Sequence, residues 1–133
     1  EFEGLKIWGS PHSLWFKGVN PRCKAFMGTE KDLAKHYEKI PNDVDILITH
    51  EPPFGILDGI PNEYDGTLFH VGNKSLRDCV LSSDRFPNLK LHVFGHIHEQ
   101  GGQIFETTLT KFINASYVNE NYKPFNKLIR LTL

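Results

Sequence analysis

Two apolar runs, each closed by histidine, constrain the fold of this chain more than any other feature. Residues 44–49 lead directly into His50, and residues 91–94 lead through a glycine into His96 and His98. Short apolar runs rich in β-branched residues are typical of buried strands. In α/β sheets, ligands bind beyond the carboxyl ends of the strands. The pattern therefore predicts three imidazoles at one edge of a sheet.

The residues around these histidines narrow the geometry and the chemistry. Pro52 and Pro53 forbid both helix and ladder pairing, so the chain must leave the sheet at His50. Neutral imidazole is the commonest protein ligand for transition metals, and three imidazoles suit Zn, Mn or Fe. Two interpretations of His96 and His98 stay open, a metal-binding pair and a surface pair, because a His-x-His pair at a strand end is also a common surface feature.

The composition excludes several functional classes. With 133 residues the chain is long enough for one compact domain, and its net charge of −1 gives no direct nucleic-acid signal. No apolar run is long enough to span a membrane. Cys23 and Cys79 stand far apart without C-x-x-C spacing. We interpret both as free thiols in a reducing, intracellular compartment that the sequence does not specify further.

Helices and strands alternate first, and strands follow. Thr29 is predicted to cap a helix that continues to residue 40, with Asp32 at its third position, and Asn73 to cap a second helix. Further strands are predicted at 103–109, 111–115 and 128–133. The order β-α-β-α-β-β-β-β indicates an α/β layered domain with an antiparallel edge or a second sheet.

Two long loops, at 12–28 and 54–72, carry further candidates. Trp15 and Phe16 lie in the first, Phe54 and His70 in the second. Long loops in a compact domain are often functional, and aromatic rings can stack a ligand. Two alternatives weigh against this: the rings cover the sheet edge, and His70 is a plain loop histidine.

Carboxylates that could complete a metal site are scarce. Glu51 and Glu99 flank the histidines and are predicted to orient the imidazoles without binding metal themselves. A pair of divalent cations usually needs a bridging carboxylate, and Asp58 and Asp65 fall in a loop that we expect to be flexible. The sequence therefore provides only part of the ligand set that a pair of metal ions needs.

Several motifs together resemble a known family. Thr-His-x-Pro-Pro followed by Gly-His-x-His is similar to the C-terminal half of a calcineurin-like metallophosphoesterase. Five stretches resemble its metallophosphoesterase-domain-containing (fetal-brain) subgroup and its bacterial relatives, and the similarity runs over nearly all of the chain. These stretches are residues 3–11, 45–53, 70–72, 90–99 and 114–116.

The resemblance implies a fold and a ligand set. Residues 1–133 would be the C-terminal portion of a single metallophosphoesterase domain, part of a layered α/β/β/α sandwich with mixed sheets. His50 and His96 match the family histidines on the second of two divalent metals, and His98 matches a ligand of the first. The metals would be Mn, Fe or Zn.

The chain departs from the family pattern, and the departure shapes the expected function. The family's Asp-x-His, Gly-Asp and Gly-Asn-His-Asp/Glu motifs do not occur. We therefore expect a phosphodiesterase or phosphomonoesterase half that is inactive alone, with at most partial metal occupancy. Its partners would be the missing N-terminal half, in the same chain or another, and a phosphate ester such as a nucleotide. The alternative is a non-catalytic structural subunit of a larger assembly.

Overall fold

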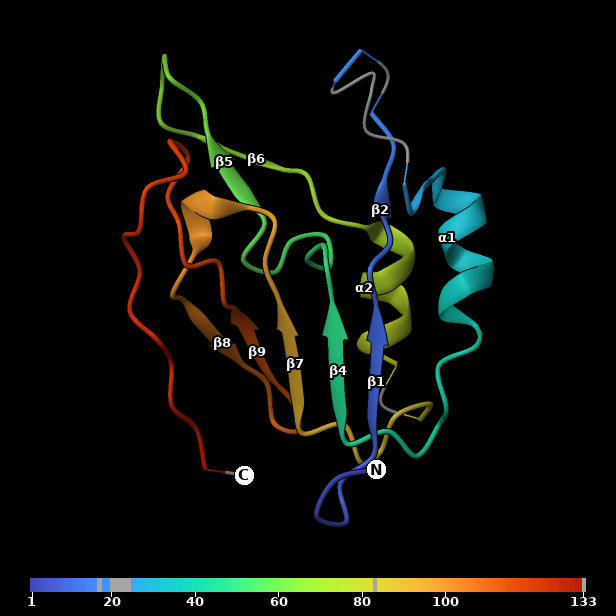
Figure 1. Ribbon diagram of the computed structural model, residues 1–133. Helices are drawn as coiled ribbons and strands as arrows, with labels where there is room; N and C mark the ends of the chain where they lie inside the picture. Colours follow the sequence, from blue (N-terminus) through green and yellow to red (C-terminus); the bar gives the residue numbers. More distant parts are fainter. Residues whose placement is uncertain (17, 20–24, 83, 133) are drawn as a thin grey trace.

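A five-stranded mixed sheet forms the centre of the structure (Figure 1). The structure is a computed structural model that describes residues 1–16, 18–19, 25–82 and 84–132. Four strands are parallel and the last in space, β8, runs antiparallel at the edge. The α/β fold with a mixed sheet expected from the sequence is confirmed. In spatial order the strands are β1 (Ile7–Ser10), β4 (Ile46–Thr49), β7 (Leu91–Phe94), β9 (Lys111–Asn114) and β8 (Ile104–Glu106).

Two short helices make the crossovers between the first three strands, and both begin at the predicted caps. Helix α1 (Glu30–Tyr37) starts with a capping box in which Thr29 and Asp32 bond each other's backbone. Helix α2 (Lys74–Val80) starts at Asn73, whose side chain accepts from Leu76 N. The first helix ends at Tyr37 rather than at residue 40.

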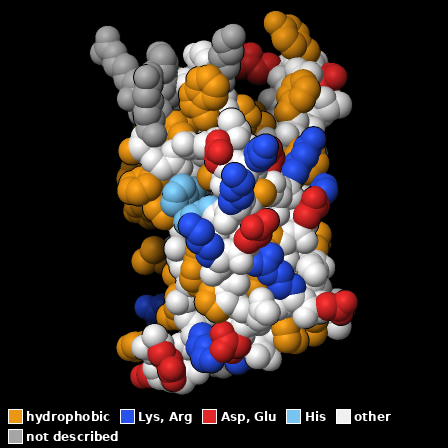
Figure 2. Space-filling view, turned by 90° about the vertical axis from the view of Figure 1, so that its right-hand side faces the viewer, with side chains coloured by type: hydrophobic (Ala, Val, Ile, Leu, Met, Phe, Trp, Pro, Cys, Tyr) orange, Lys and Arg blue, Asp and Glu red, His pale blue; other side chains and the backbone are white. Residues whose placement is uncertain are grey.

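The main core lies between the sheet and these helices. Side chains that alternate along the strands point to this face, and the inner faces of α1 and α2 cover them. Figure 2 looks at the molecule from the α1 side, where Lys, Arg, Asp and Glu side chains are interspersed over the surface. The fully buried members of the core include Leu33, Tyr37, Leu47, Leu76, Leu89, Phe94 and Phe112.

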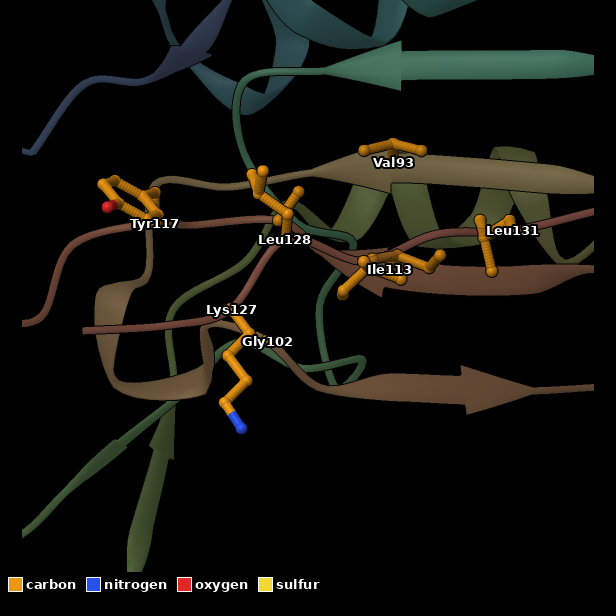
Figure 3. Close-up of a pocket in the computed structure, with 9 residues that line it drawn as sticks. Val93, Gly102, Ile113, Tyr117, Lys127, Leu128 and Leu131 are labelled. Atoms are coloured by element: carbon orange, nitrogen blue, oxygen red, sulfur yellow. The ribbon is translucent and has the colours of Figure 1, made fainter. Parts of the chain in front are cut away.

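The other face of the sheet carries apolar residues with much less cover. Ile7, Ile48 and Ile104 keep 43%, 47% and 44% of their surface exposed. Part of this face is covered by the C-terminal segment, where Leu128 and Leu131 lie against the strands over a small apolar cavity (Figure 3).

This C-terminal segment corrects one prediction from the sequence. Residues 128–132 form no strand, although their apolar pattern predicted one. A segment forms a strand only where it lies beside the edge of another strand and pairs with it. The segment instead crosses the sheet face, where Ile129 packs with Ile46, Leu91 and Ile113.

The two long loops contain more structure than predicted. In the first, β2 (Ser13–Leu14) pairs with β3 (Met27–Gly28). In the second, β5 (Gly59–Pro61) and β6 (Leu68–His70) form an antiparallel hairpin.

Two further expectations concern the cysteines and membranes. Cys79 is buried, has no disulfide partner among the described residues, and burial raises the pKa of its thiol. Cys23 lies outside the described residues. Within the described ranges, no helix has the length and apolar character needed to cross a membrane.

Candidate metal centre

The three predicted histidines follow two neighbouring parallel strands. His50 comes directly after β4, and His96 and His98 follow β7, which pairs with β4. The backbone N–H of Gly95 donates to the His50 carbonyl at 3.1 Å, which ties the two strand ends together. As a result the rings of His50 and His96 lie with their centroids 4.6 Å apart.

His98 lines the same hollow as this pair. The chain turns sharply at His96, which has a φ of +70°, so that it does not continue as extended strand. A left-handed conformation at a non-glycine residue is costly and often marks a functional turn. The hollow, which we call the histidine hollow, is lined by His50, Ile60, His96, Ile97, His98, Glu99, Glu120 and Tyr122.

The His98 ring is held in one tautomer by the backbone. Its Nδ1 lies 3.1 Å from the carbonyl oxygen of Asn119, and because a carbonyl can only accept, Nδ1 carries the proton. In the neutral ring, Nε2 of His98 then keeps its lone pair. A histidine that donates one N–H to a carbonyl and presents the other nitrogen is arranged as metal-binding histidines are. Asn119 was not foreseen, because its contact joins positions 21 residues apart.

The surroundings of the histidine hollow favour the neutral form of two of its imidazoles, those of His50 and His96. Partial burial, and then the neighbouring His50 and His98, lower the pKa of His96 to about 4, although its side chain still reaches solvent. Burial and His98 also lower the pKa of His50. Neutral imidazole is the form that binds metal, so no proton must be displaced from His50 or His96 near pH 7.

The donor set fits a divalent ion in kind but does not form a closed cage. Three imidazoles are suitable ligands for zinc, manganese or iron. Across the described ranges, however, no three His, Cys, Asp or Glu side chains are grouped closely enough to hold an ion as they stand. Glu99 and Glu120 at the rim add negative charge that suits a cation.

Glu51 does not orient an imidazole as the sequence analysis expected. Its carboxylate turns into the protein, where it is 2% exposed. It accepts from Leu14 N at 2.7 Å, Asn73 Nδ2 at 2.7 Å and Tyr37 OH at 3.0 Å. Burial raises the pKa of Glu51 to about 7 against these hydrogen bonds. Glu51 therefore braces the loop that carries His50, and does so from inside the core.

The remaining predicted candidates divide between two places. Glu99 lies in the short 3₁₀ helix His98–Gln100 and lines the histidine hollow. Trp15, Phe54 and His70 line a second hollow instead. Asp58, which was expected in a flexible loop, is fully buried and bonds His70. Its acceptor role depends on a hairpin that local sequence pattern did not reveal.

Comparison with known proteins places the chain. No family model matches it. Metallophosphoesterase domain-containing protein 1 of Homo sapiens and that of Mus musculus are each 40% identical to it over 133 aligned residues, 98% of this chain. The chain belongs to the metallophosphoesterase-domain family. A UPF0046 protein of Caenorhabditis elegans is 34% identical over 118 residues, 87% of this chain.

The matches also show that the family assignment covers only part of the relatives' length. The chain spans 36% of the length of the human and mouse relatives and 38% of the nematode one. It corresponds to a C-terminal part of these metallophosphoesterase-domain proteins, as the motifs indicated.

Proposed function

We propose that this metallophosphoesterase-domain chain supplies half of a divalent metal centre for phosphate-ester hydrolysis. The observation that supports the proposal most is the meeting of His50, His96 and His98 in one hollow at the carboxyl ends of two adjacent strands. A divalent ion, when bound, supplies the positive charge that stabilises developing charge on phosphate oxygens. The substrate would be a phosphodiester or phosphomonoester.

The chain's own residues contribute binding and orientation. His50, His96 and His98 would bind through neutral ring nitrogens, and the Asn119 carbonyl fixes which nitrogen of His98 is presented. Glu99 and Glu120 line the rim, where they favour entry of a cation over an anion. The hydrogen bond between Gly95 N and the His50 carbonyl keeps the two ligand-bearing strand ends in register.

The rest of the domain would complete the site. The described part of the chain brings no buried carboxylate between the three imidazoles, and a dinuclear centre usually needs one as a bridge. We therefore expect negligible hydrolase activity and only partial metal occupancy from these 133 residues alone. Assays with bis(4-nitrophenyl) phosphate and added manganese test this. Robust turnover by the isolated chain would overturn it.

The weakly covered sheet face indicates where the remaining part of the domain packs. Ile48 pairs in register with Val93, which pairs with Ile113, and Ile113 with Ile104, so one apolar row crosses four strands. The C-terminal segment covers Ile113, whereas Ile48 and Ile104 at the two ends of the row stay exposed. Such a row is stabilised by a second layer. The same surface would serve the alternative function, a structural subunit in an assembly, so surface burial alone does not separate the two functions.

Metal binding distinguishes the hydrolase half from the structural subunit. We expect calorimetry with Mn²⁺ or Zn²⁺ to give binding weaker than micromolar for the isolated chain, and His50→Ala to abolish it. His70→Asn, which replaces a histidine that lies outside the histidine hollow, serves as the control and should leave the signal unchanged. Submicromolar affinity would contradict the proposal that this chain supplies only half of the metal centre. Absence of binding even at millimolar metal would favour the structural subunit.

A further inference from the structure

A second hollow lies beside the N-terminus of α2, and none of its lining residues lines the histidine hollow. It is lined by residues from the β2 segment, the start of α1, Phe54 and the end of β6. Its volume of about 420 Å³ is in the range that holds small organic ligands. We call it the aromatic hollow. Its lining includes Trp15, Phe16, Phe54, His70 and Lys74.

A buried carboxylate orients the imidazole of the aromatic hollow. Asp58, with its side chain fully buried, accepts from His70 Nδ1 at 2.6 Å. Its other oxygen accepts from the backbone N–H groups of Gly72 at 2.8 Å and Gly55 at 3.0 Å. In the neutral form of His70, Nδ1 carries the donated proton and Nε2 keeps its lone pair. A buried acid that fixes the tautomer of a half-exposed histidine is typical of functional sites.

The backbone next to Asp58 and His70 is closely packed. A Cβ atom on Gly72 would meet the Pro52 carbonyl oxygen at 2.7 Å and Pro53 at 2.8 Å. The N–H of Asn73 also donates to the Pro52 carbonyl at 3.0 Å. The segment that carries His70 is therefore packed against the Pro-Pro turn, and the position of the imidazole is set by the fold.

Aromatic rings form the walls of the aromatic hollow. Trp15 and Phe16 are 49% and 42% exposed, which is unusual for rings whose only role is core packing. Phe54 lies 5.6 Å from the His70 ring, centroid to centroid. The Lys74 ammonium lies 5.1 Å from the centre of the Phe54 ring, a cation–π distance.

One carboxylate and one ammonium line the aromatic hollow, and they differ in their hydrogen-bond and ion-pair partners. Glu30 also lines the hollow, but its carboxylate accepts from the N–H groups of Lys74 and Ser75 and from the Ser75 hydroxyl. Within the described residues, no ion pair uses the Lys74 ammonium. The aromatic hollow thus offers one cation and one imidazole lone pair between flat apolar walls.

We propose that the aromatic hollow binds a flat aromatic anion that also carries a hydrogen-bond donor. The ring packs among Trp15, Phe16 and Phe54, the anionic group lies at Lys74, and the donor binds Nε2 of His70. The assignment does not depend on the metal centre, since none of these residues lines the histidine hollow.

Three related probes test the two polar contacts separately. 6-Hydroxy-2-naphthoate has the ring, the charge and the donor, 2-naphthoate lacks the donor, and 2-naphthol lacks the charge. We expect saturable binding by calorimetry, tightest for 6-hydroxy-2-naphthoate. Lys74→Gln should weaken both carboxylates at least fivefold and change 2-naphthol less than twofold.

The histidine variant gives the complementary pattern. His70→Asn keeps a donor for Asp58 and removes Nε2, so it should weaken 6-hydroxy-2-naphthoate and 2-naphthol at least fivefold and 2-naphthoate less than twofold. His96→Ala, which alters the metal centre, should change none of the three. No saturable binding up to millimolar probe would overturn the proposal. So would equal weakening of all three probes by Lys74→Gln and His70→Asn.

Discussion

His92 and His96 are four residues apart on one stretch of chain, yet they occupy opposite environments. His92 is fully buried in the core between Phe94 and Phe112, and burial lowers its pKa to about 3. His96 lies at the rim of a hollow beside His50. Both imidazoles are neutral at pH 7, but only the rim presents ring nitrogens to solvent and to an ion. The position of the side chain, inside the core or beyond the end of the strand, decides which histidine is structural.

The hydrogen bonds of His92 show why it belongs to the fold. Thr49 Oγ1 donates to the Glu51 carbonyl at 2.7 Å and lies 2.9 Å from His92 Nε2. Since the hydroxyl has one proton, His92 Nε2 is the donor in the second contact. Nδ1 of His92 is buried without a partner in the described structure. A proton on Nδ1 would place an unpaired charge in the core.

The largest predicted effect contrasts the two environments directly. His92→Ala removes a fully buried ring and should lower the free energy of unfolding by about 3 kcal/mol. His50→Ala at the rim should change it by less than about 1 kcal/mol. Urea denaturation followed by circular dichroism measures both. Equal losses for the two variants would mean that the rim histidines also hold the fold together.

Acid should act on the core through His92. Its pKa is about 3 in the folded chain and 6.5 in the unfolded chain, so stability is lost as the pH falls below 6.5. Between pH 7 and 4.5 this loss amounts to about 3 kcal/mol. We expect His92→Leu to lose that much less stability than the parent chain over the same interval. Parallel pH profiles for the two chains would refute the role given to His92.

Glu51 should act in the opposite direction and by a smaller amount. Burial raises its pKa from 4.5 to about 7, so its contribution to stability is complete below pH 4.5 and is lost as the pH rises through 7. Glu51→Gln, which mimics the neutral acid, should flatten this dependence and gain about 2 kcal/mol relative to the parent chain between pH 5 and 8. Denaturation at the two pH values checks the sign, and a relative loss would contradict it.

Local patterns predicted the elements, and distant contacts decided the rest. Thr29 and Asn73 cap their helices because their side chains bond backbone atoms three residues away, which sequence reasoning can detect. Strands β4 and β7 were likewise visible as apolar runs. The burial of Glu51 depends on a contact with Leu14, which is 37 residues away, so no local sequence pattern could predict that burial.

The candidate sites divide in the same way. Histidines at strand ends were predicted to meet because parallel neighbours end at one edge of a sheet. The acceptor for His98 at Asn119 and the buried acid for His70 at Asp58 come from loops whose course the sequence did not reveal.

The most direct test of the central claim follows imidazole nitrogens by ¹⁵N–¹H NMR while zinc is added. We predict shifts for His50, His96 and His98, with His98 responding at Nε2 because Asn119 occupies Nδ1. His92 in the core and His70 beside Asp58 should not respond. Zinc shifts confined to histidines outside the histidine hollow, or none at a severalfold excess of zinc, would contradict the proposed metal centre.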